Sequence, residues 1–212
     1  LIEKFASRTP AGYPMVVTEW NNGSQPDGPM MMAAYGALNG WDGLFQYSTE
    51  FWFDGWRAER SSWAQAYMQY PLAVLAFCQR HIAESSTVAW RYVTPPEKLF
   101  DATRTESPNS APLCGFHPLI GTCEWAFAAG AEPIKVDPAP YESENGEFVN
   151  SMTGELRWRR AIGQLQIRAP TLQGLIGSAD GSKVALGEVE MTLQDTGVLS
   201  VCVGALDGEP LG

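Results

Sequence analysis

The first part of the chain alternates strand-like and helix-like patterns. Two short apolar runs, "MVVTEW" at 15–20 and "WDGLFQYS" at 41–48, predict buried strands. Between them "PMMMAAYGALNG" at 29–40 predicts a helix, because Asp27 or Gly28 suits the cap, proline suits the first turn, and Asn39-Gly40 is a stop signal. The pattern is therefore strand, helix, strand with short connections.

Helices are expected on both sides of this unit. Residues 1–8 have apolar side chains on one side and basic ones on the other, which is typical of the last turns of an amphipathic helix. After an aromatic loop at 49–70, "PLAVLAFCQRHI" at 71–82 predicts a helix started by Pro71. Such alternation indicates parallel strands with helical crossovers, hence an α/β sheet or a (β/α) barrel. Two strands cannot close a barrel of eight, so the partner strands must come from elsewhere.

The rest of the chain has a different pattern of apolar and polar residues. Residues 85–140 are rich in Pro, Ser, Thr and Gly and predict an irregular linker, with a possible short helix around "CEWAFAAG". Residues 141–212 alternate apolar and polar positions between turn signals such as Thr153-Gly154 and Asp180-Gly181, which is typical of a β-sandwich. We therefore expect three parts: 1–84 as α/β, 85–140 as a linker that packs on it, and 141–212 as an all-β domain that is incomplete.

Composition and charge exclude several classes of protein. The chain has 212 residues, 45% of them hydrophobic, which is enough to bury a core. Its net charge of −10, with few and scattered Lys and Arg, argues against a nucleic-acid partner. No apolar run is long enough for a membrane span, and no targeting segment is visible. The sequence contains no recognisable localisation signal, although an extracellular or periplasmic location is favoured.

Four cysteines are too few for a disulfide scaffold. Cys78 and Cys202 fall in apolar segments and are expected to be buried thiols. Cys114 and Cys123 bracket a short loop, where free thiols, a local disulfide, or a zinc site using His117 are the alternatives, in that order. No cofactor is indicated.

The chemistry is concentrated where the two predicted strands end. Ligands of α/β proteins collect at the carboxyl ends of parallel strands, so the residues after the two runs should share one mouth. Indole and phenol faces stack on sugar rings, amides bind hydroxyl groups, and a carboxylate can attack or stabilise an oxocarbenium ion. The candidate site consists of Glu19 as the reactive group, with Trp20, Asn21, Gln46, Tyr47, Trp52 and Trp56 as substrate-binding residues.

Simpler interpretations compete with this one. An acid at a strand end is often a helix cap or half of an ion pair, and Trp41 is better explained by packing than by ligand binding. Glu50 and Asp54 could line the same mouth, yet charged loop residues are usually only solvated. Met30 to Met32 are expected to fill a helix.

The segment "YPMVVTEWNNGSQPDGPMMMAAYGALNGWDGLFQYS" resembles the seventh and eighth β/α units of retaining glycoside hydrolases built on a (β/α)8 barrel, the clan that includes cellulases, β-galactosidases and agarase-like enzymes. The stretch "FVNSMTGELRWRRAIGQLQIRAPTLQGLIG" resembles the β-sandwich that follows the barrel in bacterial members. The resemblance implies the C-terminal portion of a (β/α)8 barrel, strands seven and eight, followed by a β-sandwich domain. It also implies that Glu19 is the catalytic nucleophile.

What the resemblance implies about mechanism is double displacement on a poly- or oligosaccharide, with a second carboxylic acid as acid/base. In the clan that acid ends strand four, and no strand of this chain corresponds to it. We therefore expect the isolated chain to be inactive and to need the N-terminal part of the same enzyme, with strands one to six, as its partner. The alternative is a non-catalytic carbohydrate-binding or structural module.

Overall fold

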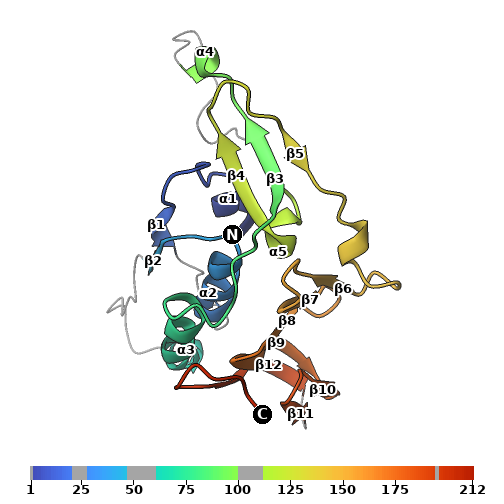
Figure 1. Ribbon diagram of the computed structural model, residues 1–212. Helices are drawn as coiled ribbons and strands as arrows, with labels where there is room; N and C mark the ends of the chain where they lie inside the picture. The colour runs from blue at the N-terminus through green and yellow to red at the C-terminus, as the bar shows by residue number, and fades with distance from the viewer. Residues whose placement is uncertain (1, 21–27, 47–60, 100–111, 194–195) are drawn as a thin grey trace.

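The computed structural model describes residues 2–20, 28–46, 61–99, 112–193 and 196–212 (Figure 1). Within these ranges the protein is a mixed α/β molecule with more strand than helix. The strands form four separate sheets in the described ranges, of which the largest has five strands. None of the described helices is long and apolar enough to cross a membrane.

The N-terminal unit has the predicted element order. It consists of α1 (Ile2–Ala6), β1 (Val16–Trp20), α2 (Gly28–Leu38), β2 (Gly43–Gln46) and α3 (Ser61–Phe77). β1 and β2 are parallel neighbours joined through α2, with Val17 opposite Leu44. Both of these side chains pack into the core that contains α2. The predicted strand, helix, strand unit is confirmed.

The end of α2 confirms the predicted stop at Asn39-Gly40. The Gly40 amide donates to the Ala37 carbonyl at 3.1 Å, and the Trp41 amide donates to the Gly36 carbonyl at 3.0 Å. This is a Schellman ending, which needs a residue with positive φ, and Gly40 has φ +70°. A Cβ at Gly40 would also lie 2.4 Å from a carboxylate oxygen of Glu84. The positive φ therefore favours glycine here, while the exposed Glu84 side chain could move to make room for a Cβ.

The helix α3 begins earlier than predicted. The sequence placed its start at Pro71 after a long loop, but the helix begins at Ser61 and contains Pro71 in its interior. An interior proline loses one helical hydrogen bond and costs about 3 kcal/mol. Burial of the same helix offsets this, because Phe77 is buried and Leu72 packs against the core. Tertiary packing outweighs the local proline signal.

A three-stranded sheet occupies much of the expected linker. β3 (Val88–Val93) runs parallel to β4 (Thr122–Ala126), and β5 (Ile134–Lys135) is antiparallel on the other side of β3. The short helices α4 (Pro96–Leu99) and α5 (His117–Ile120) lie between these strands in the chain. The helix predicted around "CEWAFAAG" is wrong: its first residues belong to β4. Pairing with β3 on one side, and the hydrogen bond from the Trp125 amide to the Thr9 carbonyl on the other, override the local helix propensity.

The C-terminal part forms antiparallel strands, as the alternating pattern predicted. A five-stranded sheet has the order β12-β9-β8-β7-β6. Its strands are β6 (Phe148–Asn150), β7 (Leu156–Arg159), β8 (Gln164–Ala169), β9 (Leu172–Asp180) and β12 (Thr196–Gly204), preceded by the 3-10 helix η3 (Ala139–Tyr141). A hairpin of β10 (Lys183–Ala185) and β11 (Glu190–Thr192) packs through Val184 and Leu186 on Leu175 of the sheet. This is one large sheet with a small hairpin on one face.

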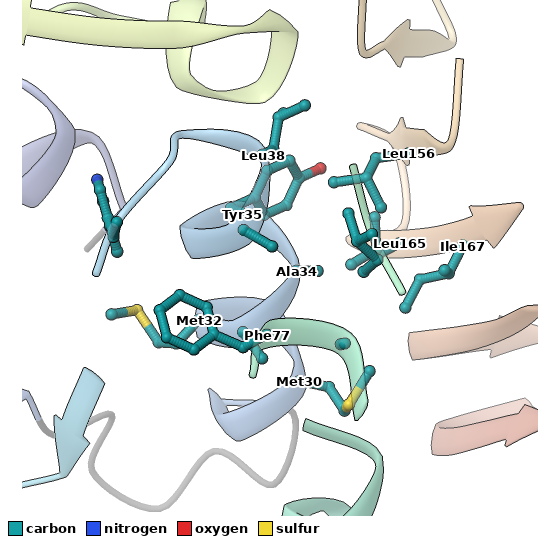
Figure 2. Packing of buried hydrophobic residues seen from close by; sticks show 14 of the residues in the cluster. Met30, Met32, Ala34, Tyr35, Leu38, Phe77, Leu156, Leu165 and Ile167 are labelled. Atoms are coloured by element: carbon teal, nitrogen blue, oxygen red, sulfur yellow. The ribbon is translucent and has the colours of Figure 1, made fainter. Parts of the chain in front are cut away.

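One hydrophobic core connects the N-terminal unit, the three-stranded sheet and the five-stranded sheet, whereas the β10–β11 hairpin packs in a second, smaller cluster. The helix α2 lies inside it, and every residue of α2 except Met31 is buried, which explains why its sequence is apolar on all sides. Leu156, Leu165 and Ile167 of the large sheet lie on one side of α2, near Ala34 and Tyr35 (Figure 2). Trp41 is fully buried in the same core, so its expected packing role is confirmed.

The thiols differ in part from expectation. All four cysteines are free; Cys114 and Cys123 are buried and Cys202 is half-buried. Cys78 is exposed, so its expected burial is wrong. It directly follows the last residue of α3, where the helix leaves the core.

Candidate active site

Glu19 lies at the carboxyl end of β1, one residue before the last residue of that strand. Gln46 is the last residue of β2, and its partner across the parallel pair is Trp20. The carboxyl ends of the two strands therefore meet at one edge, as the sequence predicted. This is the edge at which parallel sheets usually bind their ligands.

A register shift in β1 decides where Glu19 lies. The pairing moves from Val17 opposite Leu44 to Trp20 opposite Gln46, so β1 has one extra residue between these pairs. Val17 and Trp20 are both buried, whereas Thr18 and Glu19 are exposed. Because side chains alternate along a strand, Glu19, next to Trp20, lies on the face turned away from the core.

This outward face of β1 and β2 is apolar and uncovered by the described residues. Val16 is 43% exposed and Phe45 is 60% exposed. Both belong to this face, because a Cβ at Gly43 would lie 3.2 Å from Val16 Cγ1 and 3.3 Å from the Phe45 ring. In the described ranges β1 and β2 pair only with each other, so each has an open edge.

The Glu19 carboxylate is not engaged with other groups in the described part of the chain. It makes no hydrogen bond and no ion pair there, and the residue is exposed. A helix cap and an ion pair, the two simpler roles for an acid at this position, are thus absent among the residues described. The carboxylate is left available to a ligand or a partner at the strand ends.

Trp20 and Gln46 lie on the opposite, core-facing side. Trp20 is only 5% exposed and belongs to the hydrophobic core, and its indole Nε1 is buried without a hydrogen-bond partner among the described residues. The Gln46 carboxamide oxygen accepts a hydrogen bond from the Tyr70 hydroxyl. As the structure stands, these two side chains support the strand ends from behind and do not share the face of Glu19.

Tyr70 is a residue that the sequence did not single out. It lies in α3 and holds the end of β2 through Gln46. The adjacent Gln69 accepts a hydrogen bond from the Met30 amide at 3.2 Å through its side-chain oxygen, which ties α3 to the start of α2. Both residues fell in the predicted loop before Pro71. Because the start of α3 was predicted too late in the chain, the contact of Tyr70 with the end of β2 and that of Gln69 with the start of α2 were not predicted.

The remaining candidates lie outside the described residues. Four predicted substrate-binding residues lie outside the described residues, as do the two acids considered for the same mouth: Asn21, Tyr47, Trp52, Trp56, Glu50 and Asp54.

The alternative of a zinc site at His117 has little room in the structure. The ring nitrogen Nδ1 lies 2.5 Å from the Cys114 carbonyl oxygen, and Nε2 lies 3.0 Å from the Val136 carbonyl oxygen. Both ring nitrogens are thus occupied by backbone groups. Among the described residues no group of three or more His, Cys, Asp or Glu side chains could hold a metal ion.

The chain matches no protein-family model, and no curated protein or solved structure matches it significantly.

Proposed function

We propose that Glu19 is the nucleophile of a retaining glycoside hydrolase, and that this chain supplies the last two β/α units of its (β/α)8 barrel. The observation that carries the proposal is an exposed carboxylate at the carboxyl end of a parallel strand, on the face opposite the connecting helix. In such a barrel one face of each strand packs on helices and the other points inward, with catalytic residues at the carboxyl ends. Glu19 lies near the carboxyl end of β1 and on the face turned away from the core, which supports this assignment.

The open face of β1 and β2 supports a partner. Parallel sheets are almost always covered on both faces, yet Val16 and Phe45 are exposed opposite α2. Unpaired strand edges are also a liability in water. Six further strands would cover this face and pair with both edges. The proposed partner is the N-terminal part of the same enzyme, which would also carry the acid/base residue.

The reaction follows from two carboxyl groups roughly 5 Å apart. Glu19 attacks the anomeric carbon, so that a carbon–oxygen bond to the enzyme forms while the glycosidic bond breaks. The leaving oxygen takes a proton from the partner's carboxylic acid. Water then gives its proton to that same group and attacks the anomeric carbon, which releases Glu19 and the sugar with retained configuration. The five-stranded sheet belongs, in this proposal, to a β-sandwich accessory domain.

Glu19→Gln tests the proposal in the complete assembly of this chain with its partner. Substitution of a nucleophile removes the covalent step, so we expect kcat to fall at least about a thousandfold while oligosaccharide binding stays measurable. Glu209→Gln is the matched control, because Glu209 is an exposed acid near the other end of the chain. The isolated chain should lack turnover, because the acid/base residue lies in the partner. General acid catalysis alone contributes a factor of roughly 10² to 10⁴ to the rate.

Two outcomes would contradict the proposal. Hydrolysis by Glu19→Gln at a rate close to the wild-type rate would remove Glu19 from the mechanism. Oligosaccharide binding without turnover of any glycoside by the complete assembly would instead favour the non-catalytic carbohydrate-binding module.

A further inference from the structure

The outer face of the five-stranded sheet is unusually polar. Strand pairing places Asn150 opposite Arg157 and Arg157 opposite Gln166, with Arg168 opposite Gln173 on the next pair of strands. Alternation then puts the side chains of these positions on one face, opposite the one that packs on α2. The sequence predicted scattered basic residues, but the sheet gathers several of them. The polar part of this face consists of Phe148, Asn150, Arg157, Arg159, Gln164, Gln166, Arg168 and Gln173. Leu175 lies on the same face, opposite Gln166, and is covered by the β10–β11 hairpin.

One arginine on this face shows how a positive charge is neutralised there. Arg159 makes ion pairs with both Glu147 and Asp180. Those two carboxylates raise its pKa, although partial burial acts in the opposite direction. The neighbouring Arg160 also has a carboxylate partner, since its Nη2 lies 2.6 Å from Glu142 Oε1.

Arg157 has no such partner among the described residues. Its guanidinium carbon lies 3.6 Å from the centre of the Phe148 ring, in a cation–π contact. Its Nε is buried and makes no hydrogen bond to any described residue. Among the described residues, Nε is the one nitrogen of this side chain that is buried without a hydrogen-bond partner, and the residue as a whole is half-buried.

Arg168 adds a second positive charge beside the first. It lies diagonally across from Arg157 on β8, is exposed, and makes no side-chain ion pair with a described residue. Burial lowers the pKa of Arg157 and the charge of Arg168 lowers it further, whereas the nearby carboxylate of Glu147 acts in the opposite direction. The diagonal neighbours of an antiparallel pair are within reach of long side chains, so the two positive charges repel each other, and an anion bound between them would relieve that repulsion. The pair is therefore a feature that a ligand would stabilise.

We propose that Arg157 and Arg168 form a binding site for a carboxylate group on the outer face of the sheet. The guanidinium of Arg157, whose central carbon lies 3.6 Å from the centre of the Phe148 ring, is planar, and its N–H groups match the two oxygens of a carboxylate. The exposed guanidinium of Arg168 supplies the second charge, and Gln166, opposite Arg157, forms the floor between them. This site is separate from Glu19 and does not depend on the proposed function.

The charge of the whole chain limits the size of the ligand. With a net charge of −10, the protein repels extended polyanions beyond the few unpaired cations of this face. A single carboxylate, free or carried by one uronic acid unit, fits two arginines. Acetate, glucuronate and glucose distinguish a free carboxylate from one carried by a sugar. A site that recognises only the carboxylate should bind acetate and glucuronate with similar affinity. A site for an acidic sugar should bind glucuronate more tightly than acetate. Glucose, which lacks the charge, should not bind.

NMR titration of the full chain tests the proposal at constant ionic strength. The Nε–H of Arg157 is shielded from solvent and should give its own signal, which we expect to shift on addition of acetate or glucuronate together with the Phe148 ring protons. Arg157→Gln and Arg168→Gln should each weaken binding roughly 10-fold or more, because each removes a charge-assisted contact. Lys183→Gln is the control: it removes the same charge from the exposed Lys183–Glu190 pair and should leave the affinity unchanged.

If Arg157→Gln does not fold, Arg168→Gln still tests the site. Arg168 is exposed, so its substitution should leave the fold intact. Unchanged affinity in Arg168→Gln, equal losses in Arg168→Gln and Lys183→Gln, or shifts spread over all basic residues would each overturn the proposal.

Discussion

The buried amide of Asn39 connects three parts of the fold, and its removal should be costly. Its Nδ2 donates to the Tyr35 carbonyl and to the Pro118 carbonyl, both at 2.9 Å, and its Oδ1 accepts from the Cys123 amide at 3.2 Å. Asn39 is 1% exposed. These contacts join the end of α2 to α5 and β4.

The cost of Asn39→Ala follows from what it leaves unpaired. The Tyr35 carbonyl keeps its bond to the Asn39 backbone amide at 3.0 Å, whereas the Pro118 carbonyl and the Cys123 amide lose their side-chain partner. Each buried polar group left without a partner costs about 1–3 kcal/mol. We therefore expect the free energy of unfolding to fall by about 4 kcal/mol.

Asn145→Ala is the matched control for this prediction. Asn145 also makes three hydrogen bonds, to the Ser143 hydroxyl, the Glu147 amide and the Glu147 carboxylate, but it is exposed. Water can replace those partners, so the loss should stay within about 1 kcal/mol. Urea unfolding of both variants measures the difference, provided that the m value is unchanged. Equal losses for Asn39→Ala and Asn145→Ala would refute the reasoning from burial.

Two other side chains give predictions of opposite kinds. The Tyr35 hydroxyl is buried without a described partner, so Tyr35→Phe should stabilise the protein by up to about 1 kcal/mol in urea unfolding. Burial raises the pKa of Tyr35, so the folded state favours the neutral phenol. Stability therefore does not depend on Tyr35 ionisation below the ordinary value of 10.0 and falls as pH rises above it, and Tyr35→Phe should remove that fall and resist alkaline unfolding better. Hydrogen bonds from Ser182, followed by Arg159, lower the pKa of Asp180 to about 2. The contribution of Asp180 is thus present above its ordinary value and lost as pH falls through about 2, and Ser182→Ala should raise its pKa in an NMR titration.

Local signals were enough to predict the central helix and its neighbours. α2 has a proline in its first turn, a positive-φ glycine after its end, and good helix formers between them. The strands on either side are short apolar runs. Each of these features depends on residues that are close in sequence, and the alternating strands of the C-terminal part are readable for the same reason.

Contacts between distant segments were not predictable in this way. β4 pairs with β3 across a separation of about thirty residues, and nothing in "CEWAFAAG" announces that partner. No sequence signal predicts the register shift in β1 either, although this shift turns Trp20 into the core and leaves Glu19 outside. The approach of Arg157 to Arg168 likewise depends on the pairing of β7 with β8.

The identity of the nucleophile is the central claim, and a covalent trap tests it most directly. Activated fluorosugar glycosides form a glycosyl-enzyme that hydrolyses slowly, so a panel of them can be incubated with the complete assembly and digested for mass spectrometry. We expect one added sugar on the peptide that contains Glu19, and none in Glu19→Gln. A sugar trapped on any other carboxylate, while Glu19 stays unlabelled, would contradict it.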